Sequence, residues 1–158
     1  MGKKKFSLIL HDIRSVQNVA SIFRTADALS VEKIYISGFT PSPVDRFGRT
    51  RPDFIKISLG AEENVPWIKV NNVHDTLKEL SAEGHTIIAI EQSADSIDYK
   101  KIKPNYPAVF IMGNEVEGLP ADILKKANYV AEISMLGKKE SLNVSVAFAV
   151  SAYRILGI

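Results

Sequence analysis

Short apolar runs alternate along the chain with segments of helical spacing, and this alternation restricts the fold more than any other feature of the sequence. Residues 6–10 (Phe-Ser-Leu-Ile-Leu) form an apolar run suited to a buried strand. Apolar side chains then recur at helical spacing between residues 16 and 29. Residues 33–37 (Lys-Ile-Tyr-Ile-Ser) are β-branched and aromatic, and Gly38 closes them. This order of strand, helix and strand is a βαβ unit, which predicts a parallel sheet.

The same alternation continues to the end of the chain. Further strands are expected over residues 67–70, 85–91, 108–112 and 129–133. Further helices are expected over residues 75–82 and 120–127, and from Ser141 onward. Because no repeat, low-complexity tract or linker interrupts the pattern, we expect residues 1–158 to form a single α/β domain with a mostly parallel sheet flanked by helices.

One stretch departs from this pattern. Residues 38–64 combine three prolines and several glycines with mixed polar residues, and the stretch is too long for an ordinary connection between a strand and a helix. We interpret it as a loop, and loops of this length are usually functional or mobile.

Composition excludes several classes of protein. The chain of 158 residues has no apolar run of about 18 residues, which a membrane span requires, and its N-terminus lacks a signal-peptide core. A cytoplasmic protein is therefore expected. The absence of cysteine excludes disulfides and thiolate sites, and the three histidines show no paired ligand spacing, so no metal site is predicted.

Basic residues gather in three places, although the net charge is only +2. Each cluster could contact nucleic-acid phosphates, or it could be a solvated surface or tail. The three clusters are Lys3, Lys4 and Lys5; Arg46, Arg49 and Arg51; and Lys138 with Lys139.

In an open parallel sheet, ligands collect at the carboxyl ends of the strands. The loop over residues 113–118 (Gly-Asn-Glu-Val-Glu-Gly) follows such a strand and combines two glycines, which let backbone approach a ligand, with two carboxylates. It lacks the Lys and Ser/Thr of a phosphate-binding P-loop. No strand is followed by the Gly-x-Gly-x-x-Gly fingerprint, which disfavours a nicotinamide-dependent oxidoreductase.

The run of residues 141–145 (Ser-Leu-Asn-Val-Ser) places two hydroxyls and an amide at the expected start of the last helix. These groups could orient a ligand there, or Ser141 could simply cap the helix while Asn143 is buried and hydrogen-bonded. Asn18 and Arg24 in the first helix have a similar alternative, as a capping amide and an exposed arginine. Each feature alone leaves both interpretations open.

Taken together and in order, these segments resemble the three motifs of the SpoU branch of the SPOUT methyltransferases. The first motif resembles residues 18–28, the second residues 109–119, and the third residues 133–137 with residues 141–147. Residues 60–62 (Gly-Ala-Glu) resemble a further family element, so the resemblance spans nearly the whole chain.

The resemblance implies a fold and an activity. The fold is a parallel α/β sheet with a C-terminal deep trefoil knot, and two subunits of a homodimer share the active-site region. The activity is transfer of a methyl group from S-adenosylmethionine to a ribose 2′-hydroxyl of tRNA or rRNA, without a metal. Because residues 1–158 would include no separate N-terminal RNA-binding domain, this domain, its dimer partner or another protein must recognise the RNA. Two departures, Ser30 for the usual glycine and Ser134 for a frequent proline, leave this class intact.

The motifs also imply roles for individual residues. The predicted cofactor contacts are Gly113, Ile133 and Leu142, with Ile90 and Met135 as neighbours. Arg24 would lie near the reacting ribose, where we favour phosphate positioning and electrostatic activation, since an arginine rarely gives up its proton. The rest of the polar surround would be Asn18, Glu115, Ser141 and Asn143. RNA contacts are expected from Arg46, Arg49, Arg51 and Lys138. The alternative function is a non-catalytic RNA-binding or assembly protein that keeps the fold.

Overall fold

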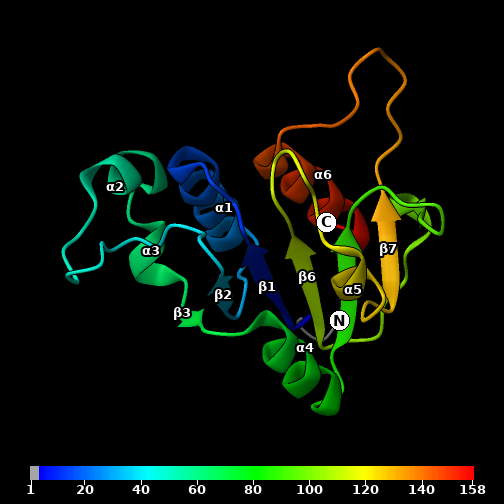
Figure 1. Ribbon diagram of the computed structural model, residues 1–158, viewed down its shortest axis with the longest axis horizontal. Helices are drawn as coiled ribbons and strands as arrows, with labels where there is room; N and C mark the ends of the chain where they lie inside the picture. Colours follow the sequence, from blue (N-terminus) through cyan, green and yellow to red (C-terminus); the bar gives the residue numbers. More distant parts are fainter. Residues whose placement is uncertain (1–3) are drawn as a thin grey trace.

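A seven-stranded parallel sheet forms the centre of the computed structural model, which describes residues 4–158. The strands lie in the order β3-β2-β1-β6-β4-β7-β5, and every pairing between them is parallel (Figure 1). The predicted parallel α/β sheet is confirmed. The strands are β1 (Phe6–His11), β2 (Ile34–Ser37), β3 (Trp67–Val70), β4 (Thr86–Ile90), β5 (Ile97–Asp98), β6 (Ala108–Met112) and β7 (Tyr129–Glu132).

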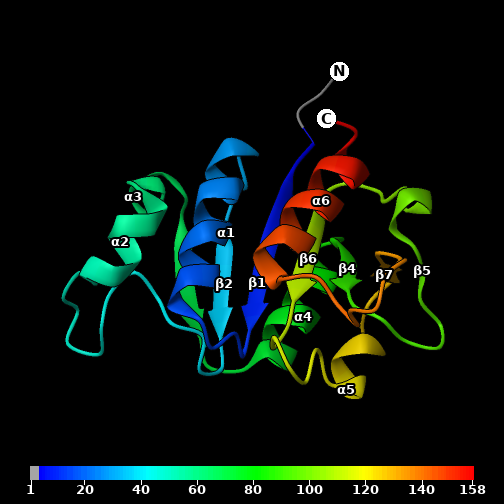
Figure 2. The same ribbon diagram turned by 90° about the horizontal axis from the view of Figure 1, so that it is seen from above.

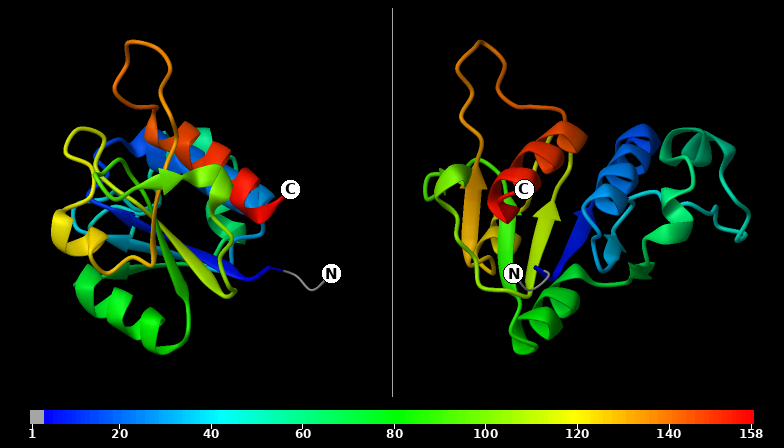
Figure 3. Two further views of the ribbon diagram at one scale, coloured as in Figure 1. Left: turned by 90° about the vertical axis from the view of Figure 1, so that its right-hand side faces the viewer. Right: turned by 180° about the vertical axis from the view of Figure 1, so that it is seen from behind.

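Helices cover both faces of this sheet. Figure 3 shows α1 and α6 on one face and α4 on the other. The α-helices are α1 (Val16–Ala28), α2 (Pro52–Ser58), α3 (Ala61–Asn64), α4 (Val73–Ala82), α5 (Ala121–Leu124) and α6 (Val144–Leu156), and a short 3₁₀ helix spans Tyr99–Lys101. Among residues 4–158, no helix has the length and apolarity that crossing a membrane would require.

Alternate residues of the central strands enter two separate cores. In β1, Leu8 and Leu10 pack in the core beneath α1 and α6, whereas Ile9 packs in the core beneath α4 and α5. Phe110 of β6 contacts Phe148 of α6 edge-on, with ring centroids 6.5 Å apart. Because both faces of the strands are buried, they read in the sequence as continuous apolar runs.

The ends of α1 follow from local sequence. The Ser15 hydroxyl accepts a hydrogen bond from the backbone N–H of Asn18 at the first turn. At the other end, the N–H of Ser30 donates to Asp27 and that of Val31 donates to Ala26, which is the Schellman arrangement. Ser30 has a φ of +55°, so a serine occupies a left-handed position that favours glycine.

Three predictions about the elements were wrong in part. The expected loop over residues 38–64 contains α2 and α3, and α2 begins at Pro52, where proline suits the first helical position. The helix expected over residues 120–127 is limited to α5. The last helix does not open at Ser141: its cap is Asn143, whose side chain accepts a hydrogen bond from the backbone of Ser145. β5 and the 3₁₀ helix after it had no clear sequence signal.

The connection from β7 to α6, residues 133–143, projects beyond the carboxyl ends of the strands (Figures 1 and 3). It carries most of the third predicted motif, whose last residues, 144–147, lie in α6. The C-terminal trefoil knot stays a prediction, and Lys3 of the first basic cluster lies outside the described residues.

Candidate active site

A cleft opens at the carboxyl ends of β4, β6 and β7. Its walls come from the ends of these strands, the loop over residues 113–118, and the connection that leads into α6. It contains all five predicted cofactor contacts and two of the predicted catalytic residues. These are Ile90, Gly113, Ile133, Met135 and Leu142, with Glu115 and Ser141.

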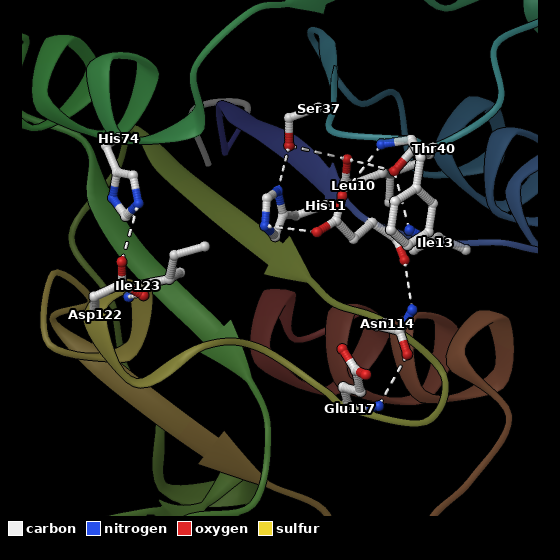
Figure 4. A network of polar contacts seen from close by, with 12 residues as sticks. Leu10, His11, Ile13, Ser37, Thr40, His74, Asn114, Glu117, Asp122 and Ile123 are labelled. Carbon is white, nitrogen blue, oxygen red and sulfur yellow. Dashed lines mark hydrogen bonds and ion pairs between the residues drawn. The ribbon is translucent and has the colours of Figure 1, made fainter.

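Asn114 fixes the shape of the loop over residues 113–118. Its side-chain oxygen accepts hydrogen bonds from the backbone N–H groups of Val116 and Glu117, both at 2.9 Å. Its side-chain amide donates to the backbone oxygen of Asp12 over 2.8 Å, which ties the loop to the end of β1 (Figure 4). Asn114 is buried, and the sequence analysis missed it. An amide directly after a strand-ending glycine was its only sequence signal.

Both glycines of this loop lie where a side chain would not fit. A Cβ atom on Gly113 would come within 2.7 Å of the Leu119 side chain. Gly118 has a φ of +67°, and a Cβ atom there would lie 2.3 Å from the Glu91 carboxylate. That carboxylate accepts a hydrogen bond from the backbone N–H of Leu119 over 3.0 Å. Glu91, which the sequence analysis also missed, therefore ties the end of this loop to the end of β4.

Glu115 binds the N-terminus of α1. Its carboxylate accepts hydrogen bonds from the backbone N–H groups of Arg14 and Ser15, both at 3.1 Å, and from the Asn18 side-chain amide at 3.2 Å. Partial burial raises the pKa of the Glu115 carboxyl. The hydrogen-bond donors together lower this pKa by more than burial raises it, so it lies below its ordinary value. A charged carboxylate at this helix N-terminus is also favoured by the helix dipole.

Asn18 continues this chain of hydrogen bonds to α6. Its side-chain oxygen accepts a hydrogen bond from the Asn143 side-chain amide over 3.0 Å. The Asn143 side-chain oxygen accepts in turn from the backbone N–H and the hydroxyl of Ser145, at 2.9 and 2.6 Å. Glu115, Asn18 and Asn143 therefore join residues from all three predicted motifs beside the cleft.

Other predicted site residues lie elsewhere. Arg24 is exposed on α1, does not line the cleft, and forms no side-chain hydrogen bond or ion pair with any residue in the described part of the chain. Lys138 is exposed on the projecting connection before α6. The three arginines of the second basic cluster line a different cavity, between β2 and α2. Figure 1 places this cavity's loop and the projecting connection towards opposite ends of the long axis.

A second polar network lies at the end of β1, and the sequence analysis did not predict it (Figure 4). His11 Nδ1 lies 2.8 Å from the Ser37 hydroxyl, and His11 Nε2 lies 3.4 Å from the Asp12 carboxylate. Burial lowers the pKa of His11 more than the neighbouring Asp12 raises it, so this pKa lies below its ordinary value. Asp12 also accepts a hydrogen bond from the Phe39 backbone N–H. The network thus fixes the loops that follow β1 and β2.

Known proteins match this arrangement over most of the chain. The model of the SpoU rRNA methylase family matches residues 5–153. YacO of Bacillus subtilis, named for the TrmH family of tRNA/rRNA methyltransferases, is 31% identical over 154 residues, which are 98% of this chain and 59% of YacO. The chain therefore spans about three-fifths of the length of this relative.

Two solved structures show the same fold. The AdoMet-bound rRNA methyltransferase from Sinorhizobium meliloti superimposes with a TM-score of 0.87 and 27% identity, over 98% of this chain and 56% of that one. An RNA 2′-O ribose methyltransferase superimposes with a TM-score of 0.82 and 25% identity, over 99% of this chain and 57% of that one. Since the family model covers nearly the whole sequence, the chain belongs to the SpoU rRNA methylase family.

Proposed function

We propose that this protein transfers a methyl group from S-adenosylmethionine to a ribose 2′-hydroxyl of tRNA or rRNA. The observation that carries this proposal is the hydrogen-bonded chain from Glu115 through Asn18 to Asn143 beside a cleft at the carboxyl ends of the strands. The AdoMet-bound relative and the 2′-O ribose methyltransferase share this fold, which supports both the cofactor and the chemistry.

The cleft suits this cofactor. Apolar side chains such as Met112, Leu142 and Ala147 can cover an adenine ring, and the backbone of residues 113–118 can supply hydrogen bonds. Glu91 and Glu117 also line the cleft, and their negative charge favours a bound sulfonium cation. When bound, S-adenosylmethionine would supply the electrophilic methyl group. Its transfer to the ribose oxygen breaks the methyl–sulfur bond and releases S-adenosylhomocysteine and the 2′-hydroxyl proton, which solvent water can accept.

Glu115 is better suited to positioning than to proton transfer. Its two oxygens already accept three hydrogen bonds from residues 14, 15 and 18 at the start of α1, and its pKa is lowered, so it is a weak base at neutral pH. We assign it the task of holding Asn18, which in turn holds Asn143. Correct alignment of the ribose oxygen with the methyl group can lower the activation barrier by several kcal/mol.

Arg24 requires a different explanation, because it does not reach the cleft of its own chain. We propose that a second copy supplies it. On α6, the side chains of Val146, Val150 and Tyr153 are exposed at the spacing of a single helical stripe, which suits burial against another subunit. In such a homodimer, Arg24 of one subunit would hold an RNA phosphate at the other's cleft through its delocalised positive charge. The C-terminal knot belongs to the same proposal.

Methyl transfer can be tested directly. The protein is incubated with methyl-labelled S-adenosylmethionine and bulk tRNA or rRNA, and the RNA is then digested to nucleosides. Label in 2′-O-methyl nucleosides is the expected result, and label in a methylated base would contradict the proposal. If calorimetry shows RNA binding but no cofactor binding, the alternative of a non-catalytic RNA-binding protein is favoured. The exposed loop that carries Arg46, Arg49 and Arg51 is consistent with that alternative.

A further inference from the structure

We propose that the cavity between β2 and α2 binds unpaired RNA by stacking bases on Phe39 and Phe47. This cavity, called the aromatic groove below, is an open hollow of about 650 Å³ lined by residues 38–42, 44–47, 49–53 and Lys69. The inference rests on the proposed function, because it names the kind of RNA that the same enzyme would accept.

Two phenylalanine rings are unusually open to solvent in this groove. Phe39 is 57% exposed and Phe47 is 66% exposed, whereas Phe6, Phe23, Phe54, Phe110 and Phe148 are all fully buried. The Phe47 ring lies 4.7 Å from the guanidinium of Arg46 and 5.0 Å from that of Arg49. Proteins that bind single-stranded nucleic acid use this combination, with aromatic rings for the bases and arginines for the backbone.

The loop that carries Phe47 is held rigidly. The Asp45 carboxylate accepts hydrogen bonds from the backbone N–H groups of Phe47 and Arg49, at 2.8 and 3.0 Å. A backbone bond from Asp45 to Arg49 closes the turn, and Val44 pairs with Thr50 in an antiparallel bridge at its base. Because the backbone of this turn is held before RNA arrives, little loop freedom is lost when a base stacks on the ring.

The charge of the groove favours a nucleic acid over an apolar protein segment. Four cationic side chains and two carboxylates line it. Asp45 pairs with Arg49 at 2.8 Å and Asp53 pairs with Arg51 at 3.4 Å, whereas Arg46 forms no ion pair with any residue from 4 to 158. The phosphates of an RNA duplex could pair with the cations, but its bases are stacked inside the helix and could not reach the phenylalanine rings. An unpaired strand can offer phosphates to the cations and bases to the rings.

Arg14 connects the aromatic groove to the cofactor cleft. Its guanidinium lies 5.9 Å from the Phe39 ring, which lines the groove, while its backbone N–H donates to Glu115, which lines the cleft. The loops that carry these residues follow β1, β2 and β6 and lie along one edge of the sheet (Figure 2). A strand stacked in the groove would therefore lead towards the cleft, and the target nucleotide would lie in an unpaired region of the RNA.

The test compares one RNA strand in two states. A fluorescein-labelled 16-nucleotide RNA without self-complementarity is titrated with protein, alone and annealed to its complement, and anisotropy gives the affinity. We expect tighter binding of the unpaired strand. Phe47→Leu, which keeps apolar bulk but removes the ring, should weaken that binding about fivefold or more, since stacking contributes about 1–3 kcal/mol per base. Phe47→Trp should retain it.

Controls separate this inference from its alternatives. Ile68→Ala removes an exposed apolar side chain outside the groove and should leave RNA affinity unchanged. Equal affinity for strand and duplex, or wild-type affinity in Phe47→Leu, would overturn the inference. A changed sedimentation coefficient in Phe47→Leu with unchanged RNA affinity would assign the groove to a subunit contact and overturn it too.

The failure of this inference differs from failure of the proposed function. If the wild-type protein methylates RNA while Phe47→Leu binds the unpaired strand normally, only the stacking inference fails. If the wild-type protein transfers no methyl group but prefers the unpaired strand through Phe47, the methyltransferase proposal fails and the groove assignment stands.

Discussion

The side-chain amide of Asn143 donates a hydrogen bond to the side-chain oxygen of Asn18 over 3.0 Å and joins α6 to α1 across 125 positions of the chain. The same Asn143 caps α6 through its oxygen, which accepts from the backbone N–H of Ser145. One amide therefore fixes where the last helix begins and where the first helix lies relative to it.

These two tasks can be separated by substitution. Asn143→Asp keeps the capping oxygen but loses the amide donor, whereas Asn143→Ala loses both. We expect the alanine variant to lose about 1 kcal/mol of unfolding free energy in urea titrations, and the aspartate variant to lose less. Both should lower kcat/KM for methyl transfer about tenfold or more, because the cleft wall shifts. A fully active aspartate variant would show that the bond to Asn18 does not position the site.

The helix start at Asn143 also shows where prediction from sequence reaches its limit. Ser141 and Asn143 are both good capping residues, so local preference could not choose between them. The bond to Asn18 favours Asn143, and that contact exists only in the folded chain. The short helices α2 and α3 were missed for a similar reason: they are too brief to show periodicity, and they pack against α1 through residues such as Phe54.

The long periodic elements and the cleft were more predictable. β1, β6 and α1 have strong apolar patterns, and they form where the patterns place them. The cofactor-contact set was named by resemblance, and all of its members line one cleft. The partners inside the site were not predictable, since Glu115 meets Asn18 across 97 positions and Glu91 meets Leu119 across 28. Such contacts depend on the order of strands in the sheet, which periodicity does not give.

Glu115 should make the stability of the protein depend on acid. The pKa of Glu115 in the folded protein lies below its ordinary value. Glu115 therefore makes its full contribution to the unfolding free energy above the unfolded pKa of about 4.3, and this contribution is lost as the pH falls through the folded pKa. Glu115→Gln removes this titration. Urea unfolding at pH 7 and at pH 3 should therefore show a smaller acid-induced loss in the variant. The same loss in both proteins would mean that other carboxyls account for it.

Gly113→Ala should damage the cofactor cleft. The new Cβ atom would lie 2.7 Å from the Leu119 side chain and 2.9 Å from the Gly118 backbone, so the loop must shift. We expect affinity for S-adenosylmethionine, measured by calorimetry, to fall about tenfold or more, with about 1–3 kcal/mol lost from stability. Gly137→Ala is the matched control for stability, since its Cβ atom would meet no atom within 4 Å. Unchanged affinity in Gly113→Ala would contradict the assignment of this loop.

Ser30→Gly should stabilise the protein. Ser30 has a φ of +55° at the end of α1, and a left-handed conformation costs a non-glycine residue about 1–2 kcal/mol. The greater freedom of glycine in the unfolded chain offsets about 0.4–1 kcal/mol of that gain. A net increase of about 0.5–1 kcal/mol in unfolding free energy is expected. Ser30→Ala keeps the strain and should show no increase; an equal gain in both variants would rule out the backbone explanation.

Val150→Lys should separate the proposed homodimer into monomers, because it places a charge in the middle of the exposed apolar stripe on α6. Analytical ultracentrifugation should report half the wild-type mass, with the unfolding midpoint little changed at this partly exposed position.

Subunit mixing then tests where Arg24 acts. Arg24→Ala and Gly113→Ala subunits should each be weakly active alone. If Arg24 serves the partner's cleft, random exchange should create mixed dimers with one intact site, restoring about a quarter of wild-type activity. If Arg24 serves its own cleft, mixing restores none.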